Sequence, residues 1–270
     1  MSLIYGDCLS PSNGLSTYSD HSFQCIIADI PYLKTQNEWE IEIPLDVLWS
    51  QLTRLIKPNG VIVFFSMQDF TTKVINSQPE LFRYELIWVK EKPTQFFEAN
   101  NRFLPNHENI LIFSPSYPHL YNPQMVQGQK PYIKKKKKSA QGTNYNKDIF
   151  DEYIAINDGT RFPTSVLYFP RDNANKGIHP TQKPLGLIEL LVLSFTNRDD
   201  FVLDFCAGSG TTCVACLKTD RNYVAYEKQY YYFLQIQKRL DAFRNYHEDR
   251  YKKPPKVHAQ QQQLEYLLIK

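Results

Sequence analysis

Long apolar runs without polar alternation constrain the fold of this chain more than any other feature. The runs "FQCIIADI" and "VIVFF" carry mostly apolar residues at successive positions, as strands do when both faces of their sheet are covered. Between them, apolar residues recur at helical spacing from Leu45 to Ile56. Strands that alternate with helices favour an α/β domain, with a mostly parallel sheet and helices on both of its faces.

The same alternation divides the chain into four parts. Residues 1–114 show it clearly, whereas residues 115–177 are rich in Pro, Asn, Gln, Tyr and Lys and lose periodicity, apart from the short run "TSVLYF". Residues 178–246 return to helix and strand patterns, and residues 247–270 are mostly polar. We therefore expect one α/β domain, interrupted by a loop-rich insertion and followed by a polar tail.

Composition excludes several classes of protein. Of the 270 residues, 42% are hydrophobic, which is enough for a sizeable core, but no apolar run reaches the ~20 residues that a membrane helix needs. The five cysteines are an odd number and lie mostly inside apolar runs. This is typical of a reduced, cytoplasmic protein rather than a disulfide scaffold, and no signal peptide is recognisable.

Cys213 and Cys216 form a C-x-x-C pair. A zinc site needs about four ligands, and no second C-x-x-C or nearby His pair completes one. We interpret both cysteines as core-facing residues of a helix and predict no metal site.

Charge is informative only through its distribution. The net charge is +3, but Lys134 to Lys138 form an uninterrupted lysine run. Such a block cannot be buried, and a solvated loop explains it as well as a contact with phosphates does.

The stretch "FVLDFCAGSGTT" has the pattern of a nucleotide-binding turn. An apolar strand runs into Gly208 and Gly210, and a helix is expected from about Thr211. Glycines let the backbone approach a ligand closely, and the helix N-terminus offers free N–H groups to its anionic part. Glu227 ends the next strand, where it could bind ribose hydroxyls. Because Cys213 replaces the third glycine of a dinucleotide fingerprint, the ligand is either S-adenosylmethionine or another nucleotide.

A second strand ends in "ADIPY", and the two strand ends can meet in one crevice of an open α/β sheet. The amine of adenine is a poor nucleophile because its lone pair is delocalised into the ring. The Asp29 carboxylate and the carbonyl of Ile30 could each accept one of its N–H groups, which would free that lone pair for attack on a methyl donor. Pro31 fixes the chain direction, and Tyr32 supplies a flat face for a base swung out of its stack. This attack requires neither a metal nor a strong base.

These stretches together resemble the amino DNA methyltransferases, specifically the β-class of the adenine-N6 type. "DIPY" stands for the D-P-P-Y motif of that family, and "LDFCAGSGTT" for its cofactor loop. "HPTQKP" and "NRFLPNHENILIF" are similar to two further motifs. The resemblance implies a Rossmann-like S-adenosylmethionine-dependent fold with a circularly permuted motif order. It makes residues 1–114 the catalytic half, 115–177 the target-recognition insertion and 178–246 the cofactor-binding half.

The resemblance also implies roles for individual residues. Asp7 would face the cofactor adenine, while Asp204, Thr211 and Lys183 would hold the methionine amino and carboxylate groups. The remaining cofactor-binding positions would be Cys206, Gly208, Gly210, Thr212 and Glu227. The positions near the target base or along the DNA backbone would be Arg102, His107, Glu108, Lys134, Lys135 and Lys136. The chain departs from the family at Ile30, where the first proline is expected, and at Cys206, where a phenylalanine is.

The predicted activity is site-specific adenine-N6 methylation of double-stranded DNA with S-adenosylmethionine. Cytosine-N4 methylation is an alternative, but its motif usually begins with Ser rather than with Asp29. The missing third glycine and the D-x-P-Y turn argue against a nucleotide-dependent oxidoreductase. The intact Tyr32 and Gly208 argue against a non-catalytic DNA-binding protein on the same scaffold. The resemblance leaves open whether the enzyme is a homodimer, which sequence it recognises, and whether it serves a restriction nuclease or is an orphan or phage methylase.

Overall fold

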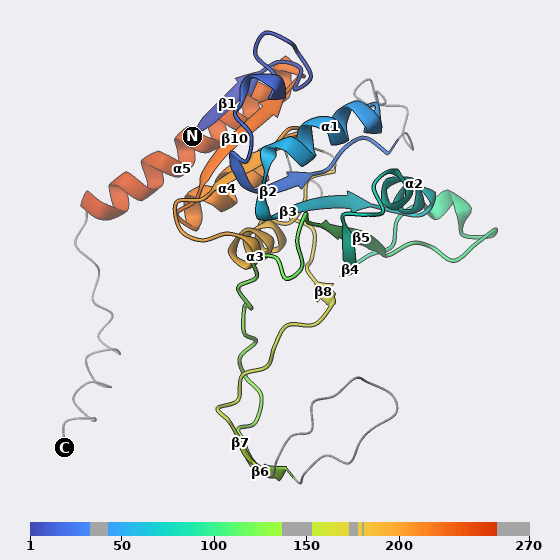
Figure 1. The fold of residues 1–270 in the computed structure, drawn as a ribbon, viewed down its shortest axis with the longest axis vertical. Helices are drawn as coiled ribbons and strands as arrows, with labels where there is room; N and C mark the ends of the chain where they lie inside the picture. The colour runs from blue at the N-terminus through green and yellow to red at the C-terminus, as the bar shows by residue number, and fades with distance from the viewer. Residues whose placement is uncertain (33–42, 137–152, 173–177, 180, 253–270) are drawn as a thin grey trace.

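The computed structural model describes residues 1–32, 43–136, 153–172, 178–179 and 181–252. Within them, eight strands form one sheet in the order β1-β10-β9-β2-β3-β5-β4-β8 (Figure 1). β5 runs antiparallel to both of its neighbours, and the other adjacent pairs are parallel. The predicted α/β architecture with a mostly parallel sheet is therefore confirmed. The strands are β1 (Ser2–Tyr5), β2 (Phe23–Ala28), β3 (Ile56–Ser66), β4 (Phe82–Val89), β5 (His107–Phe113), β8 (Val166–Tyr168), β9 (Phe201–Asp204) and β10 (Asn222–Glu227).

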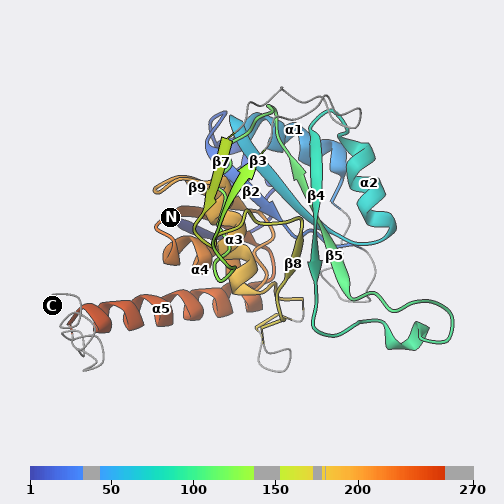
Figure 2. The ribbon, with the colours of Figure 1, turned by 90° about the horizontal axis from the view of Figure 1, so that it is seen from below.

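Helices cover both faces of this sheet (Figure 2). On one face lie α1 (Leu45–Leu55) and α2 (Asp69–Ser77), whose apolar side chains belong to one buried cluster. On the other face lie α3 (Leu185–Phe195), α4 (Thr211–Lys218) and α5 (Tyr230–Lys252), which share a second cluster. None of the helices in the described part of the chain combines the length and the apolar character that crossing a membrane requires.

The continuous apolar runs are explained by these two layers. Successive side chains of a strand point to opposite faces of the sheet, and in β2 Cys25 and Ile27 pack on the α3–α4–α5 side, whereas Ile26 packs on the α1–α2 side. A strand covered in this way is buried at every position, and in β2 every residue except Gln24 is apolar. Cys213 and Cys216 of α4 are fully buried in the same core, as predicted.

β2 and β9 lie side by side in the centre of the sheet and run parallel, with Ile26 opposite Leu203. β2 comes from the first part of the chain and β9 from the last. Their carboxyl ends therefore lie next to each other, which is where open α/β sheets bind their ligands.

The insertion and the tail differ from the prediction in two details. β8 lies within residues 115–177 but joins the main sheet by pairing with β4, because Leu167 packs on the core and the Trp88 indole N–H donates to the carbonyl of Phe169. α5 continues to Lys252, beyond the expected end of the domain at 246, and the first helix-breaking residue after its start is Pro254.

β6 (Tyr132–Lys136) and β7 (Tyr153–Asn157) pair as a separate antiparallel ribbon, which lies away from the main sheet (Figure 1).

Candidate active site

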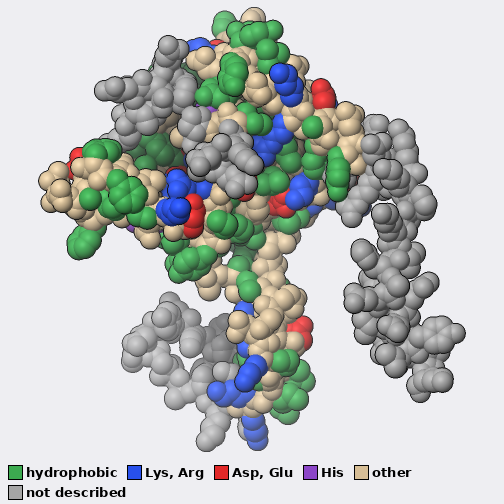
Figure 3. All heavy atoms as spheres, turned by 180° about the vertical axis from the view of Figure 1, so that it is seen from behind, with side chains coloured by type: hydrophobic (Ala, Val, Ile, Leu, Met, Phe, Trp, Pro, Cys, Tyr) green, Lys and Arg blue, Asp and Glu red, His purple; other side chains and the backbone are tan. Residues whose placement is uncertain are grey.

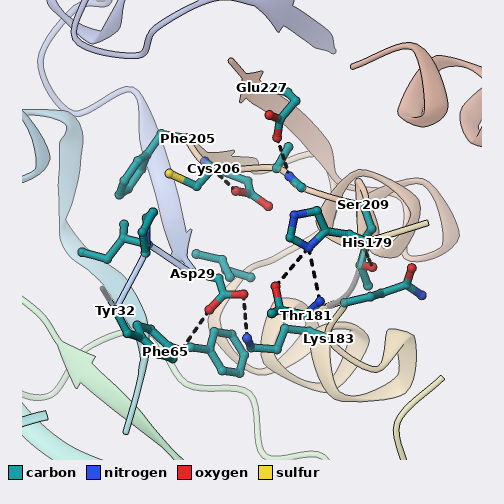
Figure 4. A pocket seen from close by; sticks show the side chains of 18 of the residues that line it. Asp29, Tyr32, Phe65, His179, Thr181, Lys183, Phe205, Cys206, Ser209 and Glu227 are labelled. Atoms are coloured by element: carbon teal, nitrogen blue, oxygen red, sulfur yellow. Dashed lines mark hydrogen bonds and ion pairs between the residues drawn. The ribbon is translucent and has the colours of Figure 1, made fainter. Parts of the chain in front are cut away.

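A cavity of about 570 Å³ lies beyond the carboxyl ends of β2, β9 and β10 (Figure 4). Its volume is in the range of small-molecule sites. The segment that follows β2 and the turn that follows β9 both line it, as their positions at strand ends predict. The predicted site residues that line the cavity are Asp7, Asp29, Ile30, Pro31, Tyr32, Glu108, Lys183, Asp204, Cys206, Gly208, Thr211, Thr212 and Glu227.

The turn after β9 depends on its two glycines. Gly208 and Gly210 have φ angles of +54° and +70°, a left-handed conformation that favours glycine. A Cβ atom at Gly210 would also lie 2.5 Å from Cγ2 of Ile236 in α5, so a larger residue would push that helix away. α4 begins at the next residue, Thr211, and the unpaired N–H groups of its first turn are suited to an anionic ligand group.

Two carboxylates flank this turn. The backbone N–H groups of Gly208 and Gln229 donate to the two oxygens of Glu227, each at 2.8 Å. Asp204 Oδ1 accepts a bond of 3.1 Å from the N–H of Cys206. Burial raises the pKa of Glu227 and raises the pKa of Asp204 to about 7. Among the residues that the structure describes, Asp204 has no ion-pair partner, so this end of the cavity is suited to a ligand that brings a positive charge.

At the other end of the cavity, four charged side chains form a chain of ion pairs. Lys183 Nζ donates to Asp29 Oδ2 at 2.6 Å and lies 3.4 Å from Glu108 Oε2, while Lys90 Nζ lies 2.6 Å from Glu108 Oε1. The Tyr32 hydroxyl donates to Asp29 Oδ1 at 2.9 Å (Figure 4). Both oxygens of Asp29 are thereby held in place.

The charged groups of this ion-pair network offset the cost of one another's burial. Burial alone would raise the pKa of Glu108, but the ammonium groups of Lys183 and Lys90 outweigh it and lower that pKa. Burial would likewise lower the pKa of Lys183, but the carboxylates of Asp29 and Glu108 outweigh it and raise that pKa. All of Lys90, Glu108 and Lys183 are buried.

Two further residues of this cavity received no role in the sequence analysis. Lys90 lies directly after β4, and only its pairing with Glu108 in the fold makes it part of the site. His179 lies over Gly208 and contacts Tyr232, with ring centroids 4.4 Å apart and the ring planes tilted by 58°. Its Nδ1 accepts from the N–H of Thr181 at 3.3 Å, and burial lowers its pKa. The motif "HPTQKP" contained His179, but nothing in the spacing indicated its contact with the glycine turn.

Asp7 and Cys206 line the same cavity as the glycine turn. Asp7 accepts from the N–H of Leu9 at 2.9 Å and from Lys228 Nζ at 2.8 Å, and the bond from Lys228 lowers its pKa. Burial raises the pKa of the Cys206 thiol well above its usual range, so this sulfur stays a neutral wall of the cavity. The neighbouring Phe205 also lines it.

Other predicted residues lie elsewhere. Arg102 and His107 line a second hollow of about 550 Å³ against the start of α2, not the cavity described above. Lys134 and Lys135 are exposed on the β6–β7 ribbon, and the side chain of Lys136 is outside the described residues.

A family model described as DNA methylase matches residues 23–238, which hold both the Asp29 segment and the glycine turn. The chain belongs to the N6/N4 DNA methylase family. Among proteins of known sequence, this DNA methylase is 27% identical over 274 residues to the Type II methyltransferase M2.MboI of Moraxella bovis, covering 91% of this chain and 87% of that protein. It is 23% identical over 254 residues to M.HpaI of Haemophilus parainfluenzae, covering 87% and 73%.

Solved structures show that the fold of this DNA methylase is that of known methyltransferases. The PvuII DNA methyltransferase, described as cytosine-N4-specific, has a TM-score of 0.63 at 17% identity, covering 90% of this chain and 85% of that one. The M1.HpyAVI–SAM complex has a TM-score of 0.57 at 21% identity, covering 89% and 98%. TTHA0409 of Thermus thermophilus, complexed with S-adenosyl-L-methionine, has a TM-score of 0.57 at 19% identity, covering 89% and 95%.

The raised pKa of Asp204 gives the free protein a measurable pH dependence. Between the ordinary carboxyl pKa of 3.8 and about 7, the folded protein binds a proton that the unfolded chain does not, so the free energy of unfolding falls as pH rises through this window. Asp204→Asn lacks this proton but keeps an oxygen for the N–H of Cys206. Between pH 4.5 and pH 8 we therefore expect the free energy of unfolding of the wild type to fall relative to that of the variant, by on the order of 1–4 kcal/mol.

Urea unfolding at both pH values measures this difference. Asp241→Asn, in an exposed ion pair of α5, is the control and should leave the difference close to zero. If the free energies of unfolding of the wild type and Asp204→Asn changed equally between the two pH values, the raised pKa of Asp204 would be contradicted.

Proposed function

We propose that this DNA methylase transfers the methyl group of S-adenosylmethionine to the N6 amine of an adenine swung out of double-stranded DNA. The observation that carries the proposal is one cavity with two ends: an oriented carboxylate, Asp29, faces the same space as the glycine turn and Glu227. An amine bound at the first end would meet a methyl donor bound at the second. The names of both relatives support a place among the Type II methyltransferases.

The residues at the glycine turn fit S-adenosylmethionine. Asp204 is a buried carboxylate that lacks a cationic partner in the described part of the chain, and the ammonium group of the cofactor would provide one. Glu227 is oriented by two backbone N–H groups, which leaves lone pairs on both oxygens for ribose hydroxyls. When bound, S-adenosylmethionine supplies an electrophilic methyl group. The two neighbours crystallised with this cofactor support the assignment.

Asp29 and Ile30 would prepare the amine for attack. Each would accept one N–H of the adenine amine, through the Asp29 carboxylate and the Ile30 carbonyl, so that the nitrogen becomes more pyramidal and its lone pair is freed. Tyr32 is bonded to Asp29 through its hydroxyl, and its ring rests on Phe70 with centroids 5.1 Å apart. The ring is therefore fixed as a surface for the base. As the new N–C bond forms, the amine loses a proton, and Asp29 is the acceptor already bonded to it.

Lys183 would position Asp29 in this mechanism. Its ammonium group lies 2.6 Å from Asp29 Oδ2, whereas the resemblance placed it at the methionine end of the cofactor. The ion pair fixes the rotation of the carboxylate, so that the lone pairs not used by Lys183 and Tyr32 are directed at the amine. Glu108 lies beside Lys183, and Lys90 pairs with the other oxygen of Glu108 without contacting Asp29.

Adenine is favoured over cytosine as the target because Asp29 opens the catalytic motif. Cytosine-N4 enzymes of this family usually carry serine there. The chemistry of the two amines is otherwise similar, and the PvuII neighbour is cytosine-N4-specific. Sequencing of the methylated DNA therefore decides between the two bases.

The β6–β7 ribbon would contact the DNA. A two-stranded ribbon fits the major groove, and side chains of this ribbon alternate between its faces, so that Tyr132 and Lys134 share one face. The Arg161 guanidinium lies over the Tyr132 ring at 5.2 Å, which adds a second cation to that face. Figure 3 shows Lys and Arg side chains gathered on this part of the molecule.

Substitutions of Asp29 and Glu227 separate the two ends of the cavity. Asp29→Ala should lower methyl transfer by at least about 100-fold but leave S-adenosylmethionine binding nearly unchanged, because, of the two ligands, only the base would contact Asp29. Glu227→Ala should instead weaken cofactor binding. Transfer of labelled methyl groups to DNA and calorimetric titration of the cofactor measure the two effects, and sequencing of the methylated DNA identifies the base and the recognised site. Methylation of cytosine alone, or full turnover by Asp29→Ala, would contradict the proposal.

Substitution of Lys183 tests whether it positions Asp29. Lys183→Met should lower kcat with little change in cofactor affinity, because it frees the Asp29 carboxylate to rotate. Lys90→Met is the matched control: it also removes an ion pair from Glu108 and should cost comparable stability, on the order of 3–5 kcal/mol, but it leaves the bond to Asp29 intact. A loss of cofactor affinity in Lys183→Met, with kcat retained, would assign Lys183 to the cofactor instead.

The salt dependence of DNA binding tests the contact of the β6–β7 ribbon. Each lysine on a phosphate contributes about 0.9 to the slope of log affinity against log salt concentration, so Lys134→Ala should lower that slope by about 1 and weaken binding to any DNA sequence. Arg198→Ala removes an exposed cation (73% exposed) three residues before β9, at the end of the sheet opposite the cavity. It should leave the slope unchanged, and equal slopes for all three proteins would exclude the ribbon contact.

A further inference from the structure

The loop between β4 and β5, residues 90–106, exposes three phenylalanines to solvent. Phe96 is 67% exposed, Phe97 80% and Phe103 99%. The loop projects from the body of the protein (Figure 2), and Figure 3 shows hydrophobic side chains on this projecting end, at the left of the view. Aromatic side chains bury large areas in protein cores and interfaces, so their concentration on one exposed loop indicates a contact surface.

The loop is a defined structure that holds these rings outward. Its two sides are joined by backbone bonds from Lys90 to Asn106 (2.7 Å) and from Thr94 to Pro105 (2.9 Å). A short helical turn, Phe96–Glu98, follows Gln95, whose φ is +59°. The side chain of Gln95 accepts a bond from that of Gln68, itself at a φ of +55°. Non-glycine residues rarely adopt this conformation unless their surroundings impose it.

The loop also forms part of the rim of the active-site cavity. Thr94, Gln95 and Phe97 line that cavity, so the exposed ring of Phe97 lies at its mouth. A base that enters the cavity stays joined to its duplex, and the neighbouring base pairs must therefore pass over this rim. Phe103 and the exposed Arg102 line the second hollow, which adjoins this cavity because Met67 lines both.

A duplex suits this surface better than a second copy of the chain. At about 200 Å² for a fully exposed ring, the three phenylalanines offer on the order of 500 Å², whereas a stable protein interface needs about 800 Å² on each partner. A stack of bases requires only one or two rings, because apolar side chains insert singly between base steps.

We propose that Phe97 and Phe103 insert into the base stack beside the displaced base and stabilise the opened duplex. This inference rests on the proposed function, since it requires a base drawn from DNA. Removing a base from the stack loses its contacts with both neighbours, and an aromatic ring restores part of them. The inserted rings therefore raise the rate of methylation only when the target base must be pulled from a base pair. They give no such advantage when the base is already unpaired.

Phe103→Ala and Phe97→Ala test this distinction. The substrates are two synthetic duplexes that carry the sequence found methylated in cells, one with the target base paired and one with an abasic site opposite it. On the paired duplex we expect kcat/KM to fall about 10- to 100-fold, and on the unpaired duplex the loss should shrink by at least about tenfold. 2-Aminopurine at the target position should brighten less with the variants than with the wild type.

Phe103 contacts almost nothing in the protein, so its loss should not affect folding. Phe201→Ala, at the opposite end of the sheet, is the matched control and should behave as the wild type on both duplexes. Equal losses on both duplexes, or no loss on either, would overturn the insertion while the proposed function stands. A variant that is fully active but sediments as a smaller species than the wild type would assign the loop to a second copy of the chain. A wild type inactive on both duplexes would overturn the proposed function as well.

Discussion

The ion pair between Lys183 and Asp29 joins the two halves of the active site. Asp29 follows β2 in the first part of the chain, and Lys183 lies just before α3 in the last. Their contact at 2.6 Å is made possible by the packing of α3 against β2, whose side chains share one core cluster. Glu108 from β5 and Lys90 from the end of β4 complete the network. Four segments of the chain thus meet below one cavity, beside the Asp29 carboxylate.

Such a network is a poor way to stabilise a fold. Desolvating buried charges offsets most of their attraction, and apolar residues of similar volume often do as well, whereas breaking one pair costs about 3–5 kcal/mol. The 3.4 Å separation between Lys183 and Glu108 Oε2 is too long for a good hydrogen bond, and that oxygen has no other hydrogen-bond partner in the described structure. The arrangement is better explained by what it does to Asp29, whose two oxygens are held by Tyr32 and Lys183.

The sequence predicted those parts of the site that local patterns encode. Apolar runs and glycines indicated the strand ends, and the rule that ligands bind beyond them brought Asp29 and Gly208 into one cavity. Long-range partners were not encoded in this way. The reversal of β5, the pairing of β8 with β4 and the role of Lys90 depend on strand order and register, which a single sequence does not specify. The partner of Lys183 depends on the same information, and so the resemblance alone placed it at the cofactor.

The cavity is divided by charge as well as by position. At the end formed by the glycine turn, the buried carboxylates of Asp204 and Glu227 have no ion-pair partners within the described chain, and burial raises the pKa of both. At the other end, each carboxylate has an ammonium group beside it. Under the proposed function the target base is neutral, and it would need acceptors whose charge is already balanced, because a base cannot compensate an unbalanced buried charge. S-adenosylmethionine carries positive groups of its own and would supply the balance that Asp204 lacks. The unequal pairing of the two ends therefore sets which ligand fits each, before any contact to the rings of either ligand is considered.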